Sequence, residues 1–320
     1  MQEAVFIRQN VEKWKRMEEM VGDELFTTPD DVVWAYNEIT SDLAFAQTQY
    51  PGSPVTAYLN QLALSLHRDL YRNRHTSWAG IVRFWTHEIP LAVYEARKCM
   101  IASLIVFVTA IIVGVISTLG DSEFPRLVLG DSYVDMTLRN IESGHPMAVY
   151  SMGAPITDFM GITFNNILVS FFTYTMGVFT SFGSGFYLGN NGIMVGAFLT
   201  FFIVRGLFVQ SILAIMLHGT LELSAIVIAG AAGFTLGNGW LFPGTYSRLR
   251  SFLYAGRRSL KILVSTLPVF VIAAFIESFF TRYTDTGDLW RILVIAASLA
   301  FILFYYVYLP IKRHRDEKAC

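Results

Sequence analysis

The sequence predicts an all-α fold: a polytopic membrane helix bundle that follows an N-terminal cytoplasmic helical domain. Three observations predict it. Hydrophobic residues make up 53% of the 320 residues, and charged residues make up only 15%. The mean hydropathy is positive, at +0.46. Several apolar segments also reach the length of about 20 residues that a membrane helix needs. Soluble domains carry about 25% charged residues, so this composition excludes an ordinary soluble enzyme.

Charge and cysteine content exclude further classes. The formal net charge is -1 and no basic block stands alone, so we expect no nucleic-acid partner. The two cysteines, Cys99 and Cys320, are too few for a disulfide framework or a cysteine-rich zinc site. Because no long apolar run precedes Met100, we expect no signal peptide.

Residues 1–75 predict a cytoplasmic bundle of three helices. Apolar side chains recur there at three- and four-residue steps, which places them on one face of a helix. The first such stripe is Ile7, Val11, Trp14 and Met17, and a later one is Leu59, Leu62, Leu66 and Leu70.

Turn and capping residues delimit these helices. Thr28-Pro29-Asp30-Asp31 is typical of a helix start, since the hydroxyl caps and the acids favour the positive end of the helix dipole. That helix is expected to run to about Gln47. Tyr50-Pro51-Gly52-Ser53-Pro54 predicts a turn in which Ser53 caps the next helix.

Residues 76–98 mix aromatic and basic side chains directly before the first apolar segment. Trp78, Trp85 and Tyr94 alternate there with Arg83 and His87. This mixture favours an amphipathic helix lying in the membrane interface. The alternative is a helix that packs on the N-terminal bundle.

Residues 99–311 predict a membrane domain with six spans. The spans are Met100–Leu119, Thr163–Leu188, Gly192–Leu213, Leu217–Leu236, Lys261–Phe280 and Leu289–Ile311. The boundary between the third and fourth is open, because residues 207–217 lack a turn signal. The alternative is a half-span over 193–204, a break at Arg205-Gly206, and one long helix over 207–236.

Loop charges predict the orientation. Basic loops remain in the cytoplasm. The segment 246–261 contains five basic residues and no acid, the tail 312–320 is also basic, and the loop 119–162 is mainly acidic. We therefore expect the inner membrane, with both termini cytoplasmic and the loop 119–162 outside. That loop either lies on the outer membrane face or packs over the spans.

A small set of polar residues lies within the apolar segments, where each ionisable group requires a partner or a task. His218 and Glu222 are four residues apart and share one helical face. That face continues through small residues, namely Ala225, Ala229, Gly233 and Gly237, which permit close helix contact. Glu277 lies near the outer end of the fifth span, and Asn165 and Asn166 lie near the outer end of the second.

We expect Asn165, Asn166, His218, Glu222 and Glu277 to converge in the outer half of the membrane. Under the long-helix alternative, His218 moves toward the midplane and the convergence weakens. Three interpretations are open: a hydrogen-bonded network that fixes helix register, a proton or ion relay, and a metal site of His218, Glu222 and Glu277.

Arg205 is either a mid-span residue that acts as counter-charge to Glu222 or Glu277, or a residue at a helix break that reaches the interface. Gly192–Gly196 and Gly233–Gly237 match the small-residue helix contact pattern. They favour internal packing over a dimer contact, which leaves a homo-oligomer as the lesser option. The sequence contains neither His-Glu-x-x-His nor Gly-x-Ser-x-Gly.

Several motifs together resemble the stage II sporulation protein M family, in its non-sporulating branch. They are Leu217-His218-Gly219-Thr220-Leu221-Glu222-Leu223-Ser224-Ala225, Ala229–Gly233, Phe164-Asn165-Asn166-Ile167, Asn191-Gly192, Ala274-Phe275-Ile276-Glu277, Ser41-Asp42-Leu43-Ala44 and Tyr58-Leu59-Asn60-Gln61-Leu62. The chain departs from the family pattern at Leu217, where a proline is expected, and this departure puts a helix break there in doubt.

The resemblance implies a multi-spanning inner-membrane protein that is not itself a known hydrolase. In spore formers the family works with secreted peptidoglycan-degrading partners during engulfment. Elsewhere it tends to occur near genes for MoxR-type ATPases and small membrane proteins.

Three functional hypotheses follow. The first is an assembly or anchoring protein of the cell envelope, whose partners are membrane lipids and other envelope or membrane proteins. The second is a transporter or channel for a small ion or lipid that uses the polar residues as a relay. The third is an intramembrane metal-dependent hydrolase. We expect no cofactor under the first two hypotheses and a divalent metal under the third.

Overall fold

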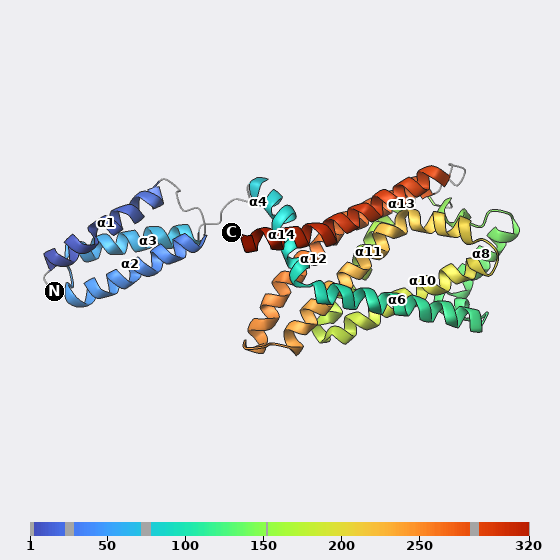
Figure 1. The fold of residues 1–320 in the computed structure, drawn as a ribbon, viewed down its shortest axis with the longest axis horizontal. Helices are drawn as coiled ribbons and strands as arrows, with labels where there is room; N and C mark the ends of the chain where they lie inside the picture. Colours follow the sequence, from blue (N-terminus) through green and yellow to red (C-terminus); the bar gives the residue numbers. More distant parts are fainter. Residues whose placement is uncertain (1–2, 23–28, 72–77, 152, 282–287, 320) are drawn as a thin grey trace. The chain divides into compact units, whose positions relative to one another are not determined.

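The structure is a computed structural model that describes residues 3–22, 29–71, 78–151, 153–281 and 288–319. All regular elements within these ranges are helices. The chain divides into two compact units, Met1–Trp78 and Ala79–Cys320, and each is described by itself. Figure 1 traces both units along the chain.

The first unit is a bundle of three helices, as the sequence predicts. They are α1 (Glu3–Gly22), α2 (Pro29–Gln49) and α3 (Pro54–Tyr71). Trp14, Ile39, Leu59 and Leu66 fill its core. Ser53 caps α3, because its Oγ accepts a hydrogen bond from the Val55 backbone N–H at 3.3 Å. The expected cap Thr28 lies outside the described residues, as does the side chain of Leu70.

Hydrogen bonds between helices hold this unit in register. The buried indole Nε1 of Trp14 donates to Asp42 Oδ2 at 2.7 Å, and Lys13 pairs with the same carboxylate at 2.6 Å. The Tyr58 hydroxyl donates to Glu18 at 2.8 Å. Burial, reinforced by that glutamate, raises the pKa of Tyr58 to about 12.

The second unit contains six helical segments that are long and apolar enough to cross a membrane. They are α6 (Arg97–Gly120), α9 with η3 (Pro155–Thr175, Met176–Phe179), α10 (Ser181–Ile203), α11 (Phe208–Leu241), α12 with η4 (Arg248–Ile276, Glu277–Thr281), and α13 with η5 and α14 (Asp288–Leu303, Phe304–Tyr308, Leu309–Ala319). Figure 1 shows α13 and α14 as one long path of helix.

The first, fifth and sixth predicted spans lie inside α6, α12–η4 and α13–α14, but the middle boundaries need correction. The second span does not run from Thr163 to Leu188, because helix α9–η3 ends at Phe179 and α10 begins at Ser181. The turn lies at Thr180. Asn190, Asn191 and Gly192, at the junction between the predicted second and third spans, lie inside α10. Asn191 Nδ2 donates to the Tyr187 carbonyl inside α10, at 2.9 Å.

The long-helix alternative describes the fourth span correctly. α10 ends at Ile203, Gly206 adopts φ +76°, and α11 continues from Phe208 through Leu217 to Leu241 without a break. The separate helix start predicted at Leu217 is therefore wrong. Leucine at that position retains the backbone N–H and lacks the ring that would interrupt the helix.

Small residues let the neighbouring helices approach α11. Ala225, Ala229, Gly233 and Gly237 are all buried, as the sequence predicts. A Cβ on Gly233 would lie 2.2 Å from Ser184 Oγ, and one on Gly237 would lie 2.4 Å from the Ser181 nitrogen. The turn between α9 and α10 therefore packs directly on the backbone of α11.

The segment that the sequence places outside forms α7 (Phe124–Leu129), α8 (Asp131–Glu142) and η2 (Ala148–Ser151). Val134 and Met147 pack against Phe201, Phe202 and Ala214, so this segment covers the ends of α10 and α11. Of the two sequence alternatives, packing over the spans is the one observed. We refer to this end of the second unit as the α8 end.

The opposite end, which we call the basic end, carries Arg248–Lys261 and α14. Residues 78–95 lie here as α4 (Trp78–Arg83), η1 (Phe84–Glu88) and α5 (Ile89–Glu95). Ile89 and Val93 of α5 are buried in the main core of the unit. Lys261 pairs with Glu88 at 2.7 Å, and Arg258 pairs with Glu95 at 2.6 Å.

Candidate functional site

Two helices bring His218, Glu222 and Glu277 together. His218 and Glu222 lie one turn apart on α11, and Glu277 is the first residue of η4. One ligand-type atom from each residue lies within 4.8 Å of the other two. His218 Nε2 is 3.9 Å from Glu277 Oε1. The His218 side chain is 7% exposed and that of Glu277 is 18% exposed, so the group is largely shielded within the bundle.

Thr281 orients the imidazole from the other side. Its Oγ1 lies 3.3 Å from His218 Nδ1, and the same hydroxyl donates to the Ile276 carbonyl at 3.3 Å. Since the hydroxyl hydrogen is used there, the oxygen accepts a hydrogen bond from Nδ1–H. Nε2 then carries a lone pair and faces the carboxylates. The π-helical turn η4 brings both Glu277 and Thr281 to His218. Such π-helical turns are frequent at functional sites.

Helix α9 contributes a polar face to the same group. Thr163, Asn166 and Ser170 follow one another at steps of three and four residues, so they share one side of the helix. Asn166 lies next to the Glu222 carboxylate. Among the described residues, Thr163 Oγ1, Asn166 Nδ2 and Ser170 Oγ are buried without a hydrogen-bond partner at normal distance, and so is Ser278 Oγ.

The structure separates the two predicted asparagines. Asn166 is buried and faces the cluster. Asn165 is exposed, and its Nδ2 donates a long hydrogen bond to Asn166 Oδ1 at 3.4 Å. Asn165 is therefore linked to Asn166 by a hydrogen bond but is not buried with it.

Arg205 does not act as the counter-charge that the sequence suggested as one option. It is exposed at the break between α10 and α11, its Nη1 donates to the Phe201 carbonyl at 2.7 Å, and its guanidinium covers the Phe201 ring. Of the described lysines and arginines, none forms an ion pair with Glu222 or Glu277. Two carboxylates and an imidazole therefore face one another, and no lysine or arginine in the described part of the chain pairs with them.

The cluster lies in the half of the bundle toward the α8 end. Helix α11 has 34 residues and is about 51 Å long, and His218 lies about 15 Å from its start. Glu277 belongs to the last turn of the fifth span. The expectation that a long α11 would weaken the convergence is wrong, because α12 and α9 meet α11 at this depth.

Sequence reasoning missed Thr281, Ser278, Thr163 and Ser170. Helical spacing alone would have identified most of them, since Thr281 is four residues after Glu277 and the other two flank Asn166 on one face. Asp158 and Tyr133 also lie within electrostatic range of Glu277. No periodicity signals Tyr133, which comes from α8. Burial raises its pKa to about 12, so it remains a neutral hydroxyl near the acids.

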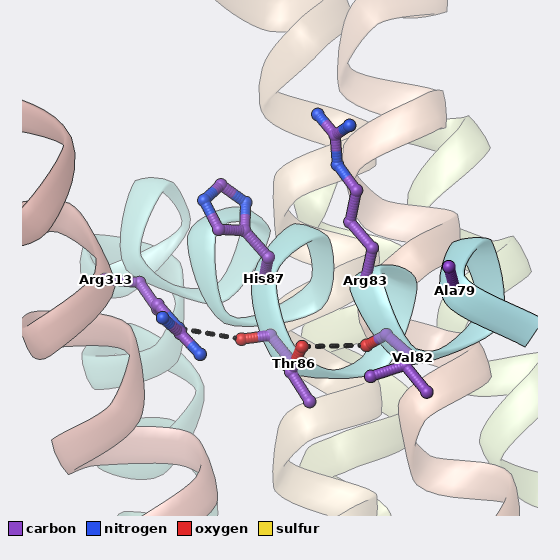
Figure 2. Close-up of a pocket in the computed structure, with 6 residues that line it drawn as sticks. All are labelled: Ala79, Val82, Arg83, Thr86, His87 and Arg313. Carbon is purple, nitrogen blue, oxygen red and sulfur yellow. Dashed lines mark hydrogen bonds between the residues drawn. The ribbon is translucent and has the colours of Figure 1, made fainter.

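A second feature is a hollow of about 540 Å³ at the basic end, between α4–η1 and α14. Figure 2 shows Arg83 and His87 rising from the α4–η1 segment, with Arg313 approaching from α14. The Nε of Arg313 donates to the Thr86 carbonyl at 2.9 Å, and His87 lies 4.0 Å from Glu317. The aliphatic side chains of Ala79 and Val82 form the rest of the wall.

Comparison with known proteins gives two separate matches. Residues 4–72 match a family model described as a domain of unknown function, DUF8413. Residues 103–282 match the model described as Stage II sporulation protein M. Searches of curated proteins and of solved structures found no significant match. The second match includes α9, α11, α12 and every residue of the polar cluster. Because it covers more than half of the 320 residues, the chain belongs to the stage II sporulation protein M family.

Proposed function

We propose that the protein is an assembly or anchoring protein of the cell envelope, in which the membrane bundle holds the 1–78 unit at the membrane and partners bind outside the bundle. The observation that carries this proposal is the modular organisation. The two family matches fall in two separately compact units, each with its own core. A separate helical module joined to a membrane domain is the form expected of an adaptor.

The surface of the first unit supports partner binding. Trp34 is 56% exposed and Leu64 is 55% exposed, although the unit has a complete core of its own. Large aromatic and aliphatic side chains left at a surface are typical of protein contacts.

We infer an inner-membrane location with both termini in the cytoplasm. Arginines and lysines concentrate at the basic end, whereas α7 and α8 carry Asp131, Asp135 and Glu142. The hollow around Arg83 and Arg313 suits the phosphates of lipid head groups, so membrane lipids are the first expected partner.

Complementation of a strain that lacks the gene tests the anchoring role. Glu222→Gln keeps a hydrogen-bonding side chain and should restore the phenotype. Trp34→Ser should fail to restore it at equal membrane abundance. If Glu222→Gln fails while the protein folds and accumulates normally, anchoring alone does not describe the function.

A second candidate is a transporter or channel for a small ion, with the polar cluster as its relay. The pairing of two shielded carboxylates with a histidine, and no basic partner among the described residues, favours it. Purified protein in proteoliposomes should then conduct protons or cations, and Glu222→Gln should stop the flux. Absence of flux in the wild type would remove this candidate. The intramembrane hydrolase requires a bound metal in addition, and it stays a hypothesis.

A further inference from the structure

We propose that His218, Glu222 and Glu277 bind one divalent transition-metal ion of the zinc class inside the membrane bundle. This site is independent of the anchoring role. One nitrogen and two carboxylates are borderline-to-hard ligands, which suit zinc, manganese or iron(II). Three protein ligands also leave further coordination positions for water or a substrate oxygen.

The ligand atoms are already close to the separations that one ion requires. Zinc binds histidine nitrogen and carboxylate oxygen at about 2.0–2.2 Å, which places tetrahedral ligands about 3.4 Å apart. The His218 Nε2 to Glu277 Oε1 distance of 3.9 Å is about half an ångström longer. All three ligand-type atoms lie within 4.8 Å of one another, so binding would require rotation of the glutamate side chains that shortens the separations by at most about 1.4 Å.

The lone pairs of His218 Nε2 and of the two glutamate carboxylates face one another. When the Thr281 hydroxyl donates to the Ile276 carbonyl, its oxygen is the acceptor for Nδ1–H of His218, and this tautomer leaves Nε2 as an acceptor. Nε2 thus faces carboxylate oxygens that are acceptors as well. Acceptors gathered in this way repel one another unless a cation or a proton lies between them. Metal-binding histidines generally have such a hydrogen-bonded group on their second nitrogen.

Asn166 is a separate observation that points to a ligand. The residue is 93% buried, its amide interacts with the Glu222 carboxylate, and its Nδ2 has no hydrogen-bond acceptor within 3.5 Å among the described residues. A buried amide N–H without a close acceptor is costly. A metal-bound water or hydroxide beside Glu222 would accept the Nδ2–H bond.

Charge balance leads to the same conclusion. A carboxylate in a membrane bundle costs at least a few kcal/mol unless it is paired. Arg205 is used at the helix break, and no other described lysine or arginine pairs with either glutamate. A dication balances both carboxylates and leaves the histidine neutral.

The test is zinc and cobalt binding by the full-length protein, purified in detergent and stripped with EDTA. We expect one Zn²⁺ per chain by elemental analysis. We also expect Co²⁺ to give visible absorption bands that zinc removes. The double variant Glu222→Gln, Glu277→Gln should lose saturable binding. Glu95→Gln, whose partner is Arg258 at the surface, and His145→Gln, which is exposed, are the matched controls and should bind as the wild type does.

Two substitutions at Thr281 test the proposal even if a variant of a metal ligand fails to fold. Thr281→Ala removes the acceptor for Nδ1–H and should lower zinc affinity about 10- to 100-fold, whereas Thr281→Ser should restore it. Equal zinc affinity in Thr281→Ala, Thr281→Ser and the wild type would overturn the proposal. So would zinc binding that survives in a folded double glutamate variant, or a wild type that binds no zinc.

Discussion

Gly233 lies at a contact between helices that is too close for any side chain. Its Cα lies where α9, α10 and α11 meet, and a Cβ there would be 2.2 Å from Ser184 Oγ and 2.9 Å from the Thr173 carbonyl oxygen. Atoms at such distances must move apart, and one of them belongs to the backbone. The small residue is therefore required for helix contact.

Gly233→Ala should destabilise the bundle by about 1–3 kcal/mol, because the added methyl forces packed helices apart. Thermal unfolding of the purified protein in detergent measures this loss of stability. Gly189→Ala on α10 is the control, since no atom lies within 4 Å of the added Cβ. That variant should be neutral or gain up to about 1 kcal/mol from helix propensity. A common shift in both variants would contradict the packing argument.

The sequence predicts which ionisable residues form the polar cluster, but it does not predict all of their contacts. The sequence indicates His218, Glu222 and Glu277 as the ionisable residues that require partners, because the apolar segments contain so few. It does not indicate that Thr281 holds the ring or that Tyr133 approaches from α8. Those contacts depend on side-chain directions in three dimensions.

At the scale of elements, the turn between α9 and α10 carries backbone strain. Thr180 has φ 120° and ψ 163°, a region that only glycine occupies readily. Neighbouring contacts maintain it, since Gly177, Ser181 and Ser184 all lie against α11 at Gly233 and Gly237.

Thr180→Gly should stabilise the protein by about 1–2 kcal/mol, because strain relief exceeds the added flexibility of the unfolded chain. Thr175→Gly, within the preceding helix, should instead destabilise it by about 0.5–1 kcal/mol. Unfolding temperatures of the two variants measure the contrast. If both substitutions destabilise equally, the strain at position 180 is not significant.

Helix boundaries were predicted correctly where charged residues replace apolar ones. They were missed where contacts between helices determine the end of a helix. α6 begins at Arg97 and ends just before Asp121, and α13 begins at Asp288, so charged residues mark these boundaries in the sequence. Asn190-Asn191-Gly192 has the composition of a turn, but Gly192 is needed for contact with the Phe107 carbonyl, so α10 continues through it.

At the scale of the whole molecule, the two units have separate cores, so damage to one should not spread to the other. Trp14→Ala should destabilise the 1–78 unit by about 3–5 kcal/mol, because Trp14 is almost fully buried. Limited proteolysis should then cleave within this unit and leave the 79–320 fragment intact. Trp34→Ala, at an exposed tryptophan, is the control and should remain resistant. Simultaneous loss of both units would show that they fold together.

Orientation is tested by cysteine labelling in intact cells. On a background with Cys99→Ser and Cys320→Ser, Asp131→Cys on α8 should react with a membrane-impermeant maleimide. Ser247→Cys, between α11 and α12, should react only after lysis. The reason is that basic segments remain in the cytoplasm. The reverse labelling pattern would refute the proposed topology.

The helical and membrane-spanning character of the chain, the number of its spans and the positions of its apolar faces can all be predicted from the amino-acid sequence. These follow from local rules, because a span needs about 20 apolar residues and a buried helical face repeats every three to four. The end of α9, the continuity of α11 and the contact between Glu277 and His218 became apparent from the packed bundle. Each of these depends on contacts between residues far apart in the chain, whose energies no local pattern contains.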